Sequence, residues 1–120
     1  MQYHIQNGDH SAYRLALADN KGTYYFTASQ IVRLEAKNVY TLVYFDDGQP
    51  PFTVSKVLKI YEELLKPHGF VRTHRSHLVN KQFVRCVQSD SVIMQDASVA
   101  ELSRRNKKSV IKQLGSTGMN

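Results

Sequence analysis

Short stretches in which apolar and polar residues alternate make up most of the chain, and this period of two predicts β-strands. Clusters of Asp, Asn, Gly, Ser and Pro separate the stretches at close intervals and predict turns. The strands predicted in this way cover residues 13–18, 23–27, 31–35, 39–45, 51–54, 70–73, 83–87, 92–95 and 98–102. Because proline cannot donate a ladder hydrogen bond, the stretch that starts at Pro51 is predicted to be an edge strand.

One stretch in the middle, residues 56–65, has apolar residues at every third or fourth position, which indicates a helix. The residues predicted to face the core are Val57, Leu58, Tyr61, Leu64 and Leu65. Ser55 is the predicted N-cap, and Pro67 and Gly69 end the helix. A short terminal helix is predicted over residues 109–114. Many short strands with one middle helix indicate a mostly β domain, a β-rich α+β fold.

The length of 120 residues suits one domain, predicted at residues 13–114 between a flexible linker (1–12) and a disordered tail (115–120). No apolar run approaches the ~20 residues that cross a bilayer, and the first residues do not resemble a signal peptide. The single cysteine, Cys86, excludes an internal disulfide and fits a reducing cytoplasm. Its place in an apolar alternation predicts a buried, inert thiol.

The excess positive charge lies in the second part of the chain. Residues 1–70 hold seven basic and seven acidic side chains, whereas residues 71–120 hold nine basic and three acidic ones, which accounts for the net charge of +6. This asymmetry indicates a surface for a polyanion. A solvated surface with a basic bias is the alternative.

Three polar groups stand out as candidate contacts. Between the apolar ends of the stretch 70–80, His74, Arg75, Ser76 and His77 form a polar excursion, and the fixed fork of a guanidinium suits phosphate oxygens and guanine edges. For His74 itself, a hydrogen bond to the backbone at a strand end is the alternative.

The second group is the basic run 104–108, with Ser103 as the predicted N-cap of a helix whose first amides could hold a phosphate. The third is Lys37-Asn38 with Tyr40, where asparagine suits adenine and lysine suits phosphate or guanine. The alternatives are a solvated helix end and an ordinary polar hairpin tip.

No set of residues indicates catalysis or metal binding. His68, His74, His77 and Cys86 are the candidates, but no cysteine or histidine completes a set at the spacing of a metal site, and no glycine-rich phosphate loop is present. An acid, a base and a nucleophile cannot be identified together. We therefore expect neither an enzyme nor a metal or cofactor site.

Three segments carry a family resemblance. Residues 70–80 follow the pattern Phe-x-Arg-x-His-Arg-Ser-x-Leu-Val-Asn, residues 31–40 run Ile-Val-Arg-Leu-Glu-Ala-Lys-Asn-Val-Tyr, and residues 102–105 run Leu-Ser-Arg-Arg. Together they resemble the LytTR family of bacterial DNA-binding domains, which are output modules of many two-component response regulators. The resemblance extends over roughly residues 13–114.

The resemblance implies a compact domain of about three small antiparallel sheets with short helices, which contacts DNA through loops and not through a recognition helix. The predicted DNA-binding residues are Lys37, Asn38, Tyr40, Arg75, Lys81, Arg104, Arg105 and Lys107. His74, Ser76 and Asn80 match positions that shape the central loop. Val39 separates Asn38 from Tyr40 where the family often has the two adjacent.

The expected function is therefore sequence-specific binding of double-stranded DNA by a cytoplasmic transcription regulator. The resemblance implies promoter direct repeats, a dimer on DNA, no membrane, and a receiver domain or sensor kinase pathway upstream. Since 120 residues cannot also hold a receiver domain, we expect a free-standing regulator or an excised output domain.

Two other classes stay open: an RNA-binding module and a β-rich protein–protein adaptor. Binders of single-stranded RNA usually expose stacking aromatic side chains among basic ones, and residues 71–120 contain only Phe83. An adaptor would show little salt-dependent binding to duplex DNA.

Overall fold

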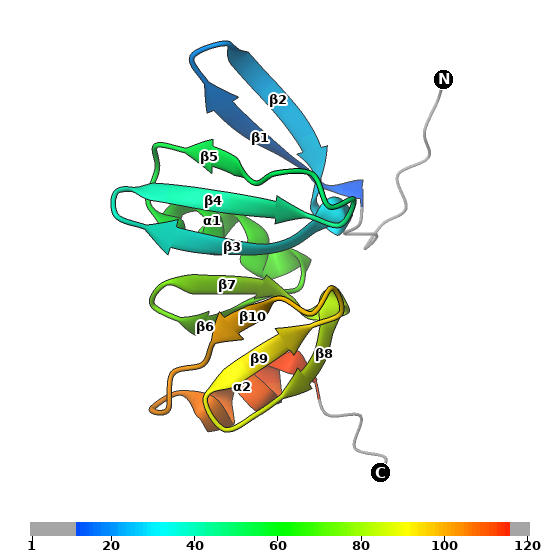
Figure 1. Cartoon of the computed structure of the whole chain (residues 1–120), viewed down its shortest axis with the longest axis vertical. Coiled ribbons are helices and arrows are strands. Elements are labelled where there is room, and N and C mark those ends of the chain that lie inside the picture. The colour runs from blue at the N-terminus through cyan, green and yellow to red at the C-terminus, as the bar shows by residue number, and fades with distance from the viewer. Residues whose placement is uncertain (1–11, 116–120) are drawn as a thin grey trace.

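Three small antiparallel sheets and two α-helices make up the protein in our computed structural model, which describes residues 12–115 (Figure 1). This arrangement confirms the predicted β-rich fold class. The predicted linker at residues 1–12 and tail at 115–120 lie, apart from Ala12 and Gly115, outside the described residues.

The first sheet is a hairpin, the second has five strands in the order β5-β4-β3-β7-β6, and the third has three strands in the order β10-β9-β8. Three short 3₁₀ turns connect some of these elements. The strands are β1 (Arg14–Asp19), β2 (Gly22–Thr27), β3 (Ile31–Lys37), β4 (Tyr40–Phe45), β5 (Phe52–Val54), β6 (Phe70–His74), β7 (His77–Asn80), β8 (Val84–Val87), β9 (Ser91–Met94) and β10 (Val99–Glu101). The helices are α1 (Leu58–Leu65) and α2 (Lys107–Leu114). The strand that includes Phe52 lies at a sheet edge, as predicted from Pro51.

The five-stranded sheet separates two hydrophobic cores. One core gathers side chains from the β1–β2 hairpin, the sheet and α1, among them Leu15, Leu34 and Leu65. The other gathers the third sheet, α2 and the opposite face of the five-stranded sheet, among them Val32, Val92 and Val110. Successive residues of a strand point to opposite faces, so β6 and β7 contribute to both cores.

The start of α1 differs from the prediction. The helix begins at Leu58 and its N-cap is Val57, whose backbone is extended, and no side chain caps it, so Ser55 is not the cap. The hydroxyl of Thr41 on β4 donates to the carbonyl of Lys56 at 2.7 Å, which holds this segment against the sheet.

The apolar stripe of α1 is also narrower than predicted. Leu58, Tyr61 and Leu65 are buried, whereas Val57 and Leu64 are exposed. Val57 precedes the helix, and so it does not continue the helical stripe.

The predictions for Ser103 and Cys86 are wrong as well. α2 begins at Lys107 with Asn106 as its N-cap, and Ser103 lies in the preceding turn, where its carbonyl accepts from the N–H of Asn106 at 3.2 Å. Cys86 is exposed. The register of β8 against β9 shifts between Val84 and Cys86, and this irregularity breaks the alternation on which the burial prediction rested.

Among the described residues, no helix is long and apolar enough to cross a membrane.

We predict that Asn80→Ala destabilises the domain by about 1–3 kcal/mol because it leaves buried polar groups without partners. The buried Asn80 amide donates to the carbonyl of Ile31 at 2.9 Å, and its Oδ1 accepts from the N–H of Gln82 at 3.0 Å. Urea unfolding measures the change. Gln82→Ala is the control, because the exposed Gln82 takes part through its backbone and should change stability by less than about 0.5 kcal/mol. Equal stabilities of the two variants would contradict the prediction.

Candidate nucleic-acid interface

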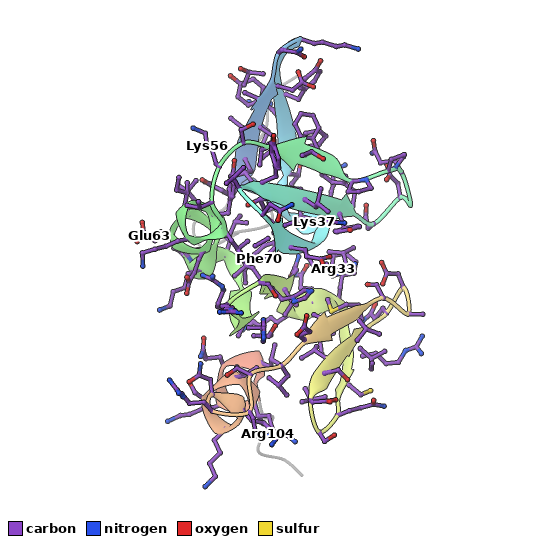
Figure 2. The ribbon with its side chains drawn as sticks, turned by 60° about the vertical axis from the view of Figure 1, so that its left-hand side comes forward. Arg33, Lys37, Lys56, Glu63, Phe70 and Arg104 are labelled. Atoms are coloured by element: carbon purple, nitrogen blue, oxygen red, sulfur yellow. The ribbon has the colours of Figure 1, made fainter. Side chains whose placement is uncertain are left out.

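Three segments far apart in the sequence lie along one edge of the molecule, the left-hand edge in Figure 1. They are the β3–β4 turn at residues 38–39, the β6–β7 turn at 75–76, and the connection between β10 and α2 at 102–106. We call them together the three-turn edge. Figure 2, which turns this edge forward, shows Lys37 above and Arg104 below, with the β6–β7 hairpin between them.

Backbone hydrogen bonds hold the three segments in register. The N–H of Ala36 on β3 donates to the carbonyl of Ser76 at 2.9 Å. The N–H of Ser103 donates to the carbonyl of Thr73 at 2.7 Å. The β6–β7 hairpin is therefore bonded to β3 on one side and to the 102–106 connection on the other, and the side chains of the edge are presented on a fixed backbone.

Side chains of the middle turn shape it from within. The N–H of Ser76 donates to Nδ1 of His74 at 3.1 Å, and the Ser76 hydroxyl lies 2.8 Å from the same nitrogen and 3.1 Å from Nδ1 of His77. His74 and Ser76 therefore bond to each other across the turn. Arg75, at its tip, is exposed.

Three arginines of this edge have free guanidinium groups. Arg75, Arg104 and Arg105 are all exposed, and within the described part of the chain their side chains make no hydrogen bond or ion pair. An open hollow of about 530 Å³ lies between the middle turn and the turn before α2. Its lining residues are Arg72, His74, Arg75, Ser103, Arg105 and Asn106. Such a cationic, hydrogen-bonding surface suits phosphate oxygens.

The β3–β4 turn places its three predicted residues differently. Lys37 and Tyr40 pair across the hairpin, and both are exposed. Asn38 has φ 58°, in the left-handed region that asparagine tolerates better than most residues. An asparagine at position 38 therefore suits the backbone conformation of the turn, in addition to the predicted contact with a DNA base. Val39, between Asn38 and Tyr40, is 67% exposed and projects from the same turn.

Two of the predicted DNA-binding residues differ from the rest in position. Lys81 follows the end of β7 that lies away from Arg75, and its N–H donates to the carbonyl of Gly69 at 3.0 Å. The structure therefore does not bring Lys81 to the three-turn edge. Lys107, at the start of α2, is half-buried, and its Nζ donates to the carbonyl of Ser89 at 3.2 Å.

A cluster that the sequence did not reveal lies behind the middle turn. His74 Nε2 is 3.5 Å from Glu101 Oε1, and His77 Nε2 is 3.9 Å from Glu35 Oε2. The ligand-type atoms of His74, His77 and Glu101 all lie within 4.8 Å of one another. Glu35 comes from β3 and Glu101 from β10, so only the tertiary fold assembles the group.

The backbone favours a hydrogen-bonded role for this cluster over a metal site. The N–H of Ser76 donates to His74 Nδ1, and the N–H of Glu101 donates to His77 Nδ1 at 3.3 Å. Because an amide N–H only donates, these two nitrogens act as acceptors, and a neutral ring then carries its proton on Nε2. Both Nε2–H groups face carboxylates, so the imidazoles link β3, the middle turn and β10.

The comparisons with known proteins agree with this geometry. The structure is that of a β-rich domain with exposed basic side chains along one edge, a surface that suits a polyanion. The family model of the LytTr DNA-binding domain matches residues 21–115, and the chain belongs to this family.

A solved structure with this fold is the LytTr DNA-binding domain of a Bacillus cereus protein described as a methyl-accepting/DNA response regulator. It shares 25% sequence identity with a TM-score of 0.71, and the match covers 86% of this chain and 97% of that one. No curated protein sequence matches the chain.

We predict that the free energy of unfolding decreases as the pH falls below about 6.5. Burial lowers the pKa of His77 below its ordinary value of 6.5, although Glu35 opposes the effect. Between the two pKa values the unfolded chain binds a proton that the folded chain does not, so stability rises with pH in that window and is lost on acidification.

Urea unfolding at pH about 7.5 and about 5.5 tests this prediction, with His77→Gln as the control. The variant cannot take up the proton at this position, so its stability should change less between the two pH values. If wild type and variant lose the same stability, His77 does not carry the effect.

Proposed function

We propose that this DNA-binding domain recognises specific sequences of double-stranded DNA as the output module of a bacterial transcription regulator. The observation that carries the proposal is the three-turn edge, which exposes Arg75, Arg104 and Arg105, without side-chain partners among residues 12–115, on a hydrogen-bonded backbone. An arginine held in this way can donate two parallel hydrogen bonds to O6 and N7 of guanine.

Some side chains of the three-turn edge are assigned to DNA bases and others to the DNA phosphates. We assign base contacts to Arg75, Arg104 and Asn38. Lys37, Arg105 and Lys107, with the hydroxyl of Tyr40, are assigned to phosphates, which position the domain without carrying sequence information. Lys81 has no part in this surface.

The family suggests a wider context, which is also part of the proposal. The Bacillus cereus relative is described as a domain of a response regulator. We propose that this domain likewise serves a two-component pathway in the cytoplasm, controlled by a receiver domain, and that two copies bind direct repeats in a promoter as a dimer. Catalysis has no place in the proposal.

The RNA-binding alternative has less support. Phe83, the one aromatic residue after residue 71, is half-buried against the second core, so it offers no stacking platform for bases. An adaptor role does not account for three exposed arginines on one edge that have no side-chain partner in the described part of the chain.

We predict that Arg75→Ala weakens binding to the preferred duplex by about 1–3 kcal/mol and relaxes selectivity at one base pair. Selection from a random duplex pool identifies the preferred sequence, and titrations at several salt concentrations follow. Log K of the wild type should fall against log salt with a slope of roughly −4 to −5 for four to six phosphate contacts.

Arg85→Ala is the matched control, because it removes the same charge from an exposed side chain on β8 of the third sheet, which donates to the carbonyl of Gln95. It should bind nearly as the wild type does. A flat salt response would disprove the proposed function, and equal effects of the two substitutions would disprove the role of Arg75.

We predict that Asn38→Gly lowers selectivity at one base pair by about 1–3 kcal/mol and leaves the melting temperature nearly unchanged. Glycine adopts a positive φ at no steric cost, so it keeps the turn while removing the amide. Asn38→Ala should both strain the turn and lose the contact. If the glycine variant keeps the full preference, Asn38 serves only the turn.

A further inference from the structure

We propose that Arg72 is a positioning residue, and that with Glu62 of α1 it fixes the turn that presents Arg75 to DNA. The inference rests on the proposed function. It assigns to Arg72, one of the basic residues in the sequence motif, a role inside the protein that does not require contact with DNA.

The guanidinium of Arg72 is held on three sides. Its Nε donates to the carbonyl of His74 at 2.9 Å and its Nη2 to the carbonyl of Arg75 at 2.5 Å. Its Nη1 donates to Glu62 Oε1 at 2.6 Å. Because the group is planar and its donors form a fixed fork, it cannot rotate outward toward a phosphate without breaking these three bonds.

The carbonyls that Arg72 binds belong to an irregular part of the backbone. The pairing of β6 with β7 shifts register between Arg72 and His74, which is typical of a β-bulge. The shift leaves Thr73 out of the pairing, and groups outside the ladder need other partners. The Thr73 carbonyl accepts from the N–H of Ser103 and its hydroxyl donates to the carbonyl of Glu101 at 2.8 Å. Arg72 bonds the next two carbonyls, those of His74 at the end of β6 and of Arg75 in the turn.

Glu62 holds the guanidinium of Arg72 in place from a helix that is itself fixed. α1 is anchored by Leu58, Tyr61 and Leu65, all buried in the first core. The side chains of Arg72 and Glu62 are only 25% and 29% exposed, so water screens the pair less than an open surface pair. The position of the turn therefore depends on a helix that is not part of the three-turn edge.

A substitution of Glu62 separates this role from simple electrostatics. Removing an acidic side chain from a DNA-binding protein should strengthen binding if only the total charge mattered. A positioning role predicts weaker binding instead. Without Glu62, the guanidinium of Arg72 is no longer held, and the turn that carries Arg75 is no longer fixed. We expect Glu62→Ala to bind the preferred duplex about three- to tenfold more weakly than the wild type.

Glu63→Ala is the matched control. Glu63 is the next residue on α1 and carries the same charge, and its 70% exposed side chain pairs with Lys59 at 3.8 Å. Figure 2 shows it at the outer side of the helix. Glu63→Ala should bind as the wild type does or slightly more tightly.

A double-variant cycle tests whether Glu62 acts through Arg75. In an Arg75→Ala background, Glu62→Ala should cause no further loss, since the side chain that it positions is gone. The salt slope of Glu62→Ala should equal that of the wild type, because no phosphate contact is removed. Arg72→Lys keeps the charge but not the fork, and it should reproduce both results even if Glu62→Ala proves too unstable to assay.

The outcomes separate this inference from the proposed function. If the wild type does not bind duplex DNA in a salt-dependent way, the proposed function fails and the inference fails with it. If the wild type binds, two results would overturn the positioning role alone. In the first, Glu62→Ala and Arg72→Lys bind as tightly as the wild type. In the second, they weaken binding by the same factor whether or not Arg75 is present.

Discussion

The burial of the β6–β7 hairpin on both faces is the constraint on which the rest of the structure depends. Leu34 on β3 lies opposite Leu78, and both belong to the first core, whereas the neighbouring Val79 and its partner Val71 belong to the second. A one-residue slip would exchange the two sets of side chains between two differently shaped cores. The register of the hairpin is therefore fixed from both sides, and the turn that joins its strands is fixed with it.

Rigidity of this kind favours binding, because a loop that is already ordered loses little conformational entropy when it binds a ligand. The polar groups behind the turn extend the constraint beyond the hairpin. Glu35 ion-pairs with Arg33 at 3.1 Å and lies near His77, while Glu101 lies near His74. These contacts tie the β6–β7 hairpin to β3 on one side and to β10 on the other, which keeps the spacing between the turns fixed.

The sequence could predict whatever depends on local pattern. Alternation located the strands except β7, which the polar residues around Arg75 concealed, and the motif around Arg75 identified the central turn. The sequence could not predict contacts between residues that are distant in the chain. These contacts include the bond from Thr41 to Lys56, which accompanies the late start of α1, and the irregular pairing that exposes Cys86. They also include the approach of the Glu35 and Glu101 carboxylates to the two histidines. Lys81 is close to Arg75 in sequence, but β7 lies between them, so the sequence did not show that the two residues stand at opposite ends of that strand.

A count of charges in the sequence does not show which basic side chains are available for binding, because that depends on their partners in the fold. Arg33 is buried, stacks on Tyr44 and pairs with Glu35, so its charge is used inside the fold. Arg72 is held by Glu62 and by two carbonyls. Arg75 has neither kind of partner among the described residues and stands at the tip of the turn. One residue type thus fills three roles within one sheet. The surface available to a polyanion is smaller than the excess of basic residues suggests, because Arg33 and Arg72 are engaged inside the fold.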